Sequence, residues 1–132
     1  MREEAIMYNT SDFIAELVKE VGKIVTAYYE EAPSKGGPYP YGVVNGINIT
    51  DLDDGDWMSF YIDLWGDEKD PTTTEKLENL CDALRNGLTE KVIFVPGKFG
   101  AHIGFDSQDD RTETEFDLCH RRTAWSARIF YN

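Results

Sequence analysis

The fold is decided by the stretch WMSFYIDLW, residues 57–65. Its apolar residues at positions 58, 60, 62 and 64 alternate with more polar ones, and this period of two is typical of a β-strand with one buried face. A second strand is predicted at residues 39–44, and the polar stretch 45–56 between the two predicts a hairpin connection. The two strands are therefore expected to be antiparallel neighbours.

Two amphipathic helices flank this pair in the sequence. Apolar residues recur at three- and four-residue spacing over residues 11–29, which predicts one long helix. Its apolar stripe is wide enough to pack on a sheet and also to contact a neighbouring subunit. A second helix is predicted over residues 73–86, with Thr72 and Glu75 forming a capping box and Gly87 ending the helix.

The last third of the chain predicts more strands. Residues 91–95 fit a short strand or a loop, and residues 99–105 and 116–131 alternate as strands, with acidic residues from 106 to 117 between them. The order is therefore helix, two strands, helix, two or three strands. This order predicts an α+β fold, a small, mostly antiparallel sheet with two main helices packed against it. We expect one domain over residues 1–132, with residues 1–10 flexible.

Composition limits the partners. The chain has 132 residues, 41% of them hydrophobic, and its 13 Lys and Arg against 25 Asp and Glu give a net charge of −12. Binding to a phosphate backbone or an anionic membrane needs clustered basic residues, so neither is expected. The acidity has two interpretations: it keeps the protein soluble, or it keeps one face from sticking to nucleic acid that passes close by.

Catalytic and metal chemistry find little support in the sequence. Cys81 and Cys119 are far apart, and without a signal segment they are expected to be reduced core cysteines of an intracellular protein. Cys119 and His120 should point to opposite faces of a strand, which disfavours a shared metal. His102 fits an exposed or hydrogen-bonded histidine better than a catalytic base. We therefore predict no catalytic residue, no metal site and no cofactor.

The acidic stretch at residues 51–56 invites a calcium interpretation. An EF-hand loop starting at Asp51 needs glycine at its sixth position and glutamate at its twelfth, where this chain has Asp56 and Ile62. An acidic hairpin turn is therefore favoured. Its aspartates form a candidate partner-facing loop: Asp51, Asp53, Asp54 and Asp56. The linker from Ser34 to Pro38 is a second loop that could reach a partner.

Several residues are candidates for contacts between subunits. The tryptophans Trp57, Trp65 and Trp125 suit interfaces, although core packing explains each of them equally well. The basic residues Arg121, Arg122 and Arg128 stand out in an acidic chain. They fit either ordinary pairing with acids on the sheet surface or a patch that meets an acidic neighbour.

Five segments, read in order, carry a family resemblance. They are residues 29–33 (YEEAP), 39–44 (YPYGVV), 61–65 (YIDLW), the predicted helix around 75–88, and 121–131 (RRTAWSARIFY). Together they resemble the tail-completion proteins of long-tailed bacteriophages, which are tail terminators and tail-to-head joining proteins. Residues 1–10 and 106–117 do not contribute to the resemblance.

The resemblance implies a structural function. Members of that family form homohexameric rings, in some cases only on the tail tube. The rings cap the tube, end its elongation and offer a docking surface to the head completion protein, without catalytic residues. The implied location is the host cytoplasm during assembly and then the head-proximal end of the virion tail. DNA would cross the ring lumen without specific binding, and net acidity would keep the duplex from sticking there.

Two other classes remain open. Another head-to-tail connector component, an adaptor or stopper, would share the size and the ring. A monomeric inhibitor that mimics DNA would instead use the acids at residues 51–56 and 106–117 as phosphate surrogates against a host protein. An enzyme is the least favoured class, because no nucleophile, base and orienting residue occur together in a recognisable motif.

Overall fold

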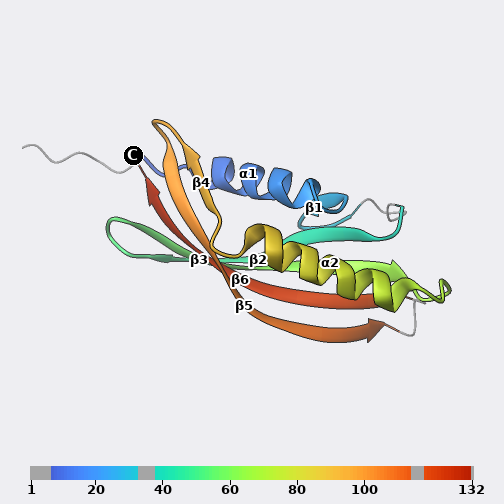
Figure 1. The fold of residues 1–132 in the computed structure, drawn as a ribbon. Helices are drawn as coiled ribbons and strands as arrows, with labels where there is room; N and C mark the ends of the chain where they lie inside the picture. Colours follow the sequence, from blue (N-terminus) through green and yellow to red (C-terminus); the bar gives the residue numbers. More distant parts are fainter. Residues whose placement is uncertain (1–6, 33–37, 114–117, 132) are drawn as a thin grey trace, which may run out of the picture.

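The computed structural model describes residues 7–32, 38–113 and 118–131. Six strands form one sheet in the order β1-β2-β3-β6-β5-β4, and two helices lie on one of its faces (Figure 1). The elements are α1 (Thr10–Gly22), β1 (Ala27–Tyr29), β2 (Tyr41–Asp51), β3 (Gly55–Asp67), α2 (Thr73–Leu88), β4 (Val92–Val95), β5 (Phe99–Glu113) and β6 (Leu118–Tyr131). One strand pair, β1–β2, is parallel and the other four are antiparallel. The predicted α+β class and the mostly antiparallel sheet are confirmed.

The strand β3, which contains the alternating residues 57–65, lies at the centre of the sheet. β3 pairs with β6 in unbroken register from Gly55 opposite Phe130 to Asp67 opposite Leu118. The alternation in residues 57–65 has the predicted effect, because its apolar positions are all buried beneath the helices: Met58, Phe60, Ile62 and Leu64. Residues of β6 that face the same core include Trp125, Ala127 and Ile129.

The first helix is shorter than predicted. α1 ends at Gly22 rather than at residue 29, and residues 27–29 form β1, which pairs with residues 42–44 of β2. The prediction failed because apolar spacing continues past the helix. The stretch VTAYY at 25–29 is β-branched and aromatic, however, and therefore suits a strand.

The second helix begins as predicted but is capped differently. The Thr72 hydroxyl donates a hydrogen bond to Asp70 Oδ1 at 2.7 Å, and Thr72 makes no side-chain cap to the helix, so the predicted capping box does not form. Gly87 does not end the helix, which continues to Leu88. Leu88 is 1% exposed, and its burial offsets the low helix propensity of the glycine before it.

Two polar stretches predicted to be loops are largely strand. β2 runs on to Asp51 and β5 to Glu113, and each contains a β-bulge. The bulge in β2 lies between Asn45 and Asn48, and the bulge in β5 lies between Phe105 and Ser107. Both flank the same level of the central β3–β6 ladder, so the sheet bends on its two sides at one place.

The N-terminal segment, the linker 34–38 and the start of the final strand lie partly outside the described residues. Of the segment predicted to be flexible, residues 1–6 lie outside the described part, whereas Tyr8 packs edge-on against Tyr131 and Thr10 begins α1. The linker 34–38 lies outside the described residues except for Pro38. The final strand, predicted from residue 116, is described from Leu118 to Tyr131, and its predicted start lies among residues 114–117, outside the described part.

Candidate interaction surface

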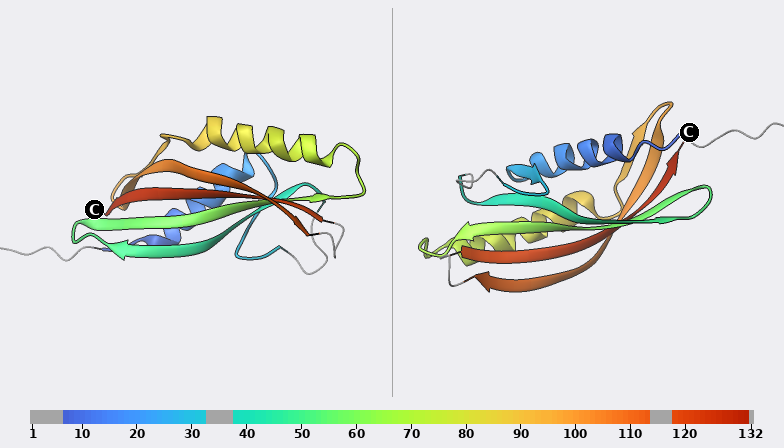
Figure 2. Two further views of the ribbon diagram at one scale, coloured as in Figure 1. Left: turned by 90° about the horizontal axis from the view of Figure 1, so that it is seen from below. Right: turned by 180° about the vertical axis from the view of Figure 1, so that it is seen from behind.

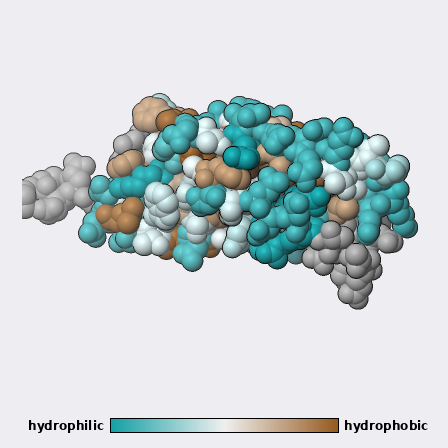
Figure 3. Space-filling view, turned by 60° about the horizontal axis from the view of Figure 1, so that its bottom comes forward, coloured by the Kyte–Doolittle hydropathy of each residue, from teal (hydrophilic) through white to brown (hydrophobic). Residues whose placement is uncertain are grey.

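The two faces of the sheet differ in what covers them. Both helices lie on one face, and in the view from below the strands lie in front of α1 (Figure 2). We call the face turned away from the helices the outer face. Figure 3 looks toward it and shows apolar side chains interspersed with polar ones, with several at the end where the β2–β3 and β4–β5 hairpins lie. The outer face therefore exposes apolar side chains that a partner could cover.

Cationic side chains stack on aromatic rings along the outer face of β3 and β6. The Arg128 guanidinium lies 4.0 Å from the centre of the Phe130 ring, and that of Arg122 lies 4.1 Å from the centre of the Tyr61 ring. Farther along the ladder, the rings of His120 and Trp65 stack with centroids 3.9 Å apart. Such contacts hold long side chains in place and leave less conformational freedom to lose when a partner binds.

Asp63 organises the middle of this face. Its carboxylate accepts two hydrogen bonds from Arg122, Nε to Oδ1 at 2.9 Å and Nη2 to Oδ2 at 3.1 Å, and one from Asn45 Nδ2 at 2.8 Å. His120 Nε2 lies 3.0 Å from Oδ1, at ion-pair distance but without hydrogen-bond alignment. That contact is ionic only when the imidazole is protonated. Asp63 and His120 are 3% and 4% exposed, so this is a buried polar cluster on an otherwise open face.

The cluster lowers the pKa of Asp63. Burial alone would raise it, but the contacts with His120, Arg122 and Asn45 outweigh burial and bring the pKa from 3.8 to about 2. Because the folded-state pKa lies below that of the unfolded chain, the carboxylate stabilises the fold above about pH 4. This contribution disappears as the pH falls through the range from about 4 to 2.

A pH series tests this stabilisation. Between pH 5 and pH 2 the free energy of unfolding should fall by about 2 kcal/mol more in the wild type than in Asp63→Asn. The asparagine at position 63 does not titrate, so this variant lacks the contribution of that one carboxylate. Urea unfolding at each pH, followed by tryptophan fluorescence, measures both proteins. Parallel pH profiles for the two would contradict the assignment.

Four apolar side chains form what we call the aromatic end of the outer face: Trp57, Val92, Phe94 and Phe130. They are 45%, 64%, 63% and 49% exposed, respectively. The sheet register places Val92 and Trp57 in one cross-strand row and Phe94 and Phe130 in the next. The Phe94 ring lies over Gly100, where a Cβ would sit 3.5 Å from its Cδ1. His102 and Arg128 lie between Val92 and Trp57 in their row, so the aromatic end combines apolar and charged side chains, a mixture that occurs at protein interaction sites.

The three tryptophans predicted as interface candidates separate clearly. Trp57 belongs to the exposed aromatic end, and Trp65 is partly buried against His120. Trp125 is fully buried, and its Nε1 donates to Thr123 Oγ1 at 2.7 Å. Trp125 therefore has no surface to offer a partner, and for this residue the core alternative is correct.

The three arginines also separate. Arg122 and Arg128 lie on the outer face, in pairs with Asp63 and Asp54. Arg121 points to the helix side, where its Nε lies 2.7 Å from Glu78 Oε1 on α2 and 2.9 Å from Asp110 Oδ1 on β5. Arg121 is 7% exposed, so it holds α2 to the sheet and is not a surface cation.

The predicted acidic loop is smaller than the sequence suggested. Asp51, Asp53 and Asp54 are exposed at the β2–β3 turn, where the Asp53 N–H donates to Asp51 Oδ1 at 3.0 Å. Asp56 is 4% exposed within β3 and accepts a hydrogen bond from the Tyr131 hydroxyl at 2.8 Å. Asp56 is therefore not partner-facing, because the strand begins at Gly55 and turns its side chain inward.

A second apolar surface lies on the helix layer. Ser11, Ile14, Ala15 and Val18 of α1, together with Tyr29 of β1, line an open hollow of about 500 Å³, which we call the α1 hollow. Ile14 and Val18 are half-buried, while Ala15 and Tyr29 are exposed. The wide apolar stripe predicted for the first helix therefore divides in two. One part packs into the core, and the other lines this hollow.

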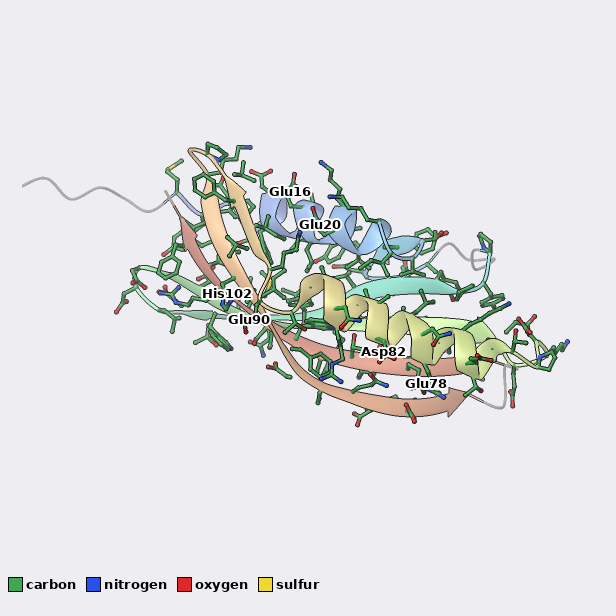
Figure 4. All side chains as sticks on the ribbon, viewed as in Figure 1. Glu16, Glu20, Glu78, Asp82, Glu90 and His102 are labelled. Carbon is green, nitrogen blue, oxygen red and sulfur yellow. The ribbon has the colours of Figure 1, made fainter. Side chains whose placement is uncertain are left out.

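The carboxylates labelled in Figure 4 lie on the helix layer and its junction with β5. Glu20 contacts Lys23 and Lys91, and Glu78 contacts Arg121. His102 is exposed, with its Nε2 2.8 Å from Glu90 Oε2, and so is the hydrogen-bonded surface histidine that the sequence favoured. Within residues 7–32, 38–113 and 118–131, no three potential metal ligands come together.

Both cysteines lie on the helix side of the sheet, in the core. Cys81 and Cys119 are buried free thiols, and burial, followed by the nearby Glu78, raises the pKa of Cys81 to about 12. Cys119 belongs to the core while His120 lies on the outer face, so the two point apart as predicted.

Neither described helix is long and apolar enough to cross a membrane.

Comparison with known proteins gives a likeness of fold. No family model matches the chain, and no curated protein does. Among solved structures, the chain is similar to one described as "Virion of native gene transfer agent (GTA) particle", with a TM-score of 0.62 and 15% sequence identity. The match covers 83% of this chain and 84% of that chain. The two proteins therefore share an architecture over most of their lengths.

Proposed function

We propose that this protein is a structural subunit of a phage-like virion. The observation that carries the proposal is the fold likeness to a chain of a gene transfer agent virion particle, over 83% of this chain. The outer face, which neither described helix covers, supports it, because a subunit of a larger assembly needs ordered apolar surface for its neighbours. The proposal involves no chemical step, and the protein acts by binding.

Within that class we propose the specific role of a tail terminator. The protein would close the head-proximal end of the tail tube as a homohexameric ring, stop elongation and present a surface to the head completion protein. The segmental resemblance to tail-completion proteins supports this role, and so does the small sheet flanked by helices that the resemblance implies. The net charge of −12 suits a ring through which DNA moves without being held.

Tail tubes provide the test. Purified protein mixed with terminator-free tubes should bind at one end of each tube, as seen by electron microscopy with a labelled protein. The bound material should correspond to six copies. An unrelated protein of similar size and acidity serves as the control for charge effects. Binding along the sides of the tube, or none at all, would contradict the terminator role.

A connector component, either an adaptor or a stopper, is the second candidate. The same fold likeness supports it, since the neighbour's description refers to a virion as a whole. Capture by portal-bearing capsids in preference to tubes would favour the connector role.

A further inference from the structure

We propose that a pocket on the outer face binds the guanidinium group of an arginine from a different protein. The pocket, which we call the bulge pocket, has a volume of about 290 Å³ and lies between the β-bulges of β2 and β5. Its lining comes from four neighbouring strands and includes Gly46, Asn48, Ser59, Tyr61, Asp106 and Ala124. The inference goes beyond the proposed function and does not depend on it.

The shape of the pocket suits a single side chain. Ser59 and Ser126 are cross-strand neighbours, and Ala124 lies in the next row, so small side chains leave the space open. The Tyr61 ring is fixed beside them, because the Arg122 guanidinium stacks on it at 4.1 Å and a side chain at position 46 would collide with it. A volume of about 290 Å³ lies just below the roughly 300–1,000 Å³ typical of small-molecule pockets.

Asp106 gives the pocket a negative charge that no cation of the described chain neutralises. Its Oδ1 accepts a hydrogen bond from the Ser126 hydroxyl at 3.2 Å, and it makes no ion pair within the described residues. The two arginines of the outer face, Arg122 and Arg128, already pair with other aspartates. A cation from outside the chain would therefore meet an unpaired carboxylate, and hydrogen bonds to a carboxylate are stronger than those between neutral groups.

The remaining polar groups of the pocket favour a guanidinium among cations. The Ser59 hydroxyl on β3 and the Asn48 amide on β2 form no side-chain hydrogen bond within the described residues, so both offer free oxygen acceptors. A guanidinium carries five N–H donors in one plane and can reach acceptors on several strands, whereas an ammonium group is a point charge with three donors. A metal ion fits less well, because no three potential ligand side chains come together in the described ranges.

Charge also indicates that the arginine comes from a different protein. This chain has a net charge of −12, so a second copy would bring like charge toward the pocket. All five arginines of the described part already contact an acid or an aromatic ring of their own chain: Arg85, Arg111, Arg121, Arg122 and Arg128. The occupant that fits is an arginine on a less acidic neighbour.

An NMR titration of the ¹⁵N-labelled full chain with N-acetyl-arginine-amide tests the proposal. The capped probe carries only the guanidinium charge, as an arginine within a protein does. The backbone amide signals of Ser59, Asp106 and Ala124 should shift and saturate with a Kd of about 10 mM or lower. The uncharged isostere N-acetyl-citrulline-amide and the capped lysine should each bind about tenfold more weakly or less.

Two variants separate charge from shape. Asp106→Asn removes the charge and keeps an oxygen that can accept the Ser126 hydrogen bond. Ala124→Leu fills the pocket and keeps the charge. Each should weaken binding of the arginine probe about tenfold or more, and thermal unfolding verifies that both fold. Asp53→Asn removes one exposed aspartate outside the pocket and should bind the probe as the wild type does, which makes it the matched control.

Four results would overturn the inference. The signals could fail to saturate up to about 50 mM probe, five times the expected Kd. Asp106→Asn could bind as the wild type does, or capped lysine could bind as tightly as capped arginine. Free L-arginine could bind about tenfold more tightly than the capped probe, which would indicate a small-molecule ligand instead of a protein. None of these measurements uses tail tubes, so they are independent of the test of the terminator role.

Discussion

Replacing Asp63 with alanine should lower the free energy of unfolding by about 3 kcal/mol. The substitution leaves Arg122 and the buried His120 without the carboxylate that both contact. Removing one partner of a buried ion pair costs about 3 to 5 kcal/mol, and the partial exposure of Arg122 places this case at the lower end. Urea denaturation at pH 7, followed by tryptophan fluorescence, measures the change.

The matched control is Asp54→Ala. Asp54 also pairs with an arginine of the outer face, Arg128, but its side chain is 69% exposed. Exposed pairs contribute less than about 1 kcal/mol, so this variant should unfold almost as the wild type does. Equal losses in the two variants would mean that burial of the Asp63 cluster has no energetic consequence.

Replacing Trp125 with alanine should be still more damaging, by about 4 kcal/mol. Trp125 is fully buried, packs edge-to-face with Phe105 at 5.1 Å between ring centroids, and donates to Thr123 Oγ1. The substitution removes a large apolar surface and leaves a cavity that neighbouring strands cannot fill without breaking their ladder. Thermal and urea unfolding both give the loss.

Trp57→Ala provides the contrast, because the same substitution is made at a tryptophan that is 45% exposed. Its stability should change by less than about 1 kcal/mol. A stability loss at Trp57 that equals or exceeds the loss at Trp125 would contradict the assignment of the two residues to surface and core.

The sequence predicted the parts of the fold that local patterns determine. The alternation in residues 57–65 identified the central strand and its buried face, and apolar spacing identified both helices. The sequence-based prediction was wrong where hydrogen-bonded pairing with distant residues determines the secondary structure. Residues 27–29 join the sheet only because β2 offers them an edge, and the acidic half of β5 is strand because β6 pairs with it. Such pairing does not appear in local periodicity.

The candidate surface was predicted in part. Trp57 and Arg128 were identified from composition, but Phe94, Phe130 and Val92 were not, because their grouping depends on the register among β3, β4, β5 and β6. The Asp63–Arg122 contact was missed for the same reason. One local signal was present: Trp57, Tyr61 and Trp65 recur every four residues, which places three aromatic rings on one face of a strand.

The paired bulges in β2 and β5 give the sheet a crease. Both fall beside the row where Tyr61 faces Ala124, so curvature concentrates along one line across the strands and the central ladder stays continuous. The outer face is thereby divided into two facets that point in different directions. One facet carries the aromatic end and the other the Asp63 cluster. Partners that bind the two facets would therefore approach this subunit from different directions.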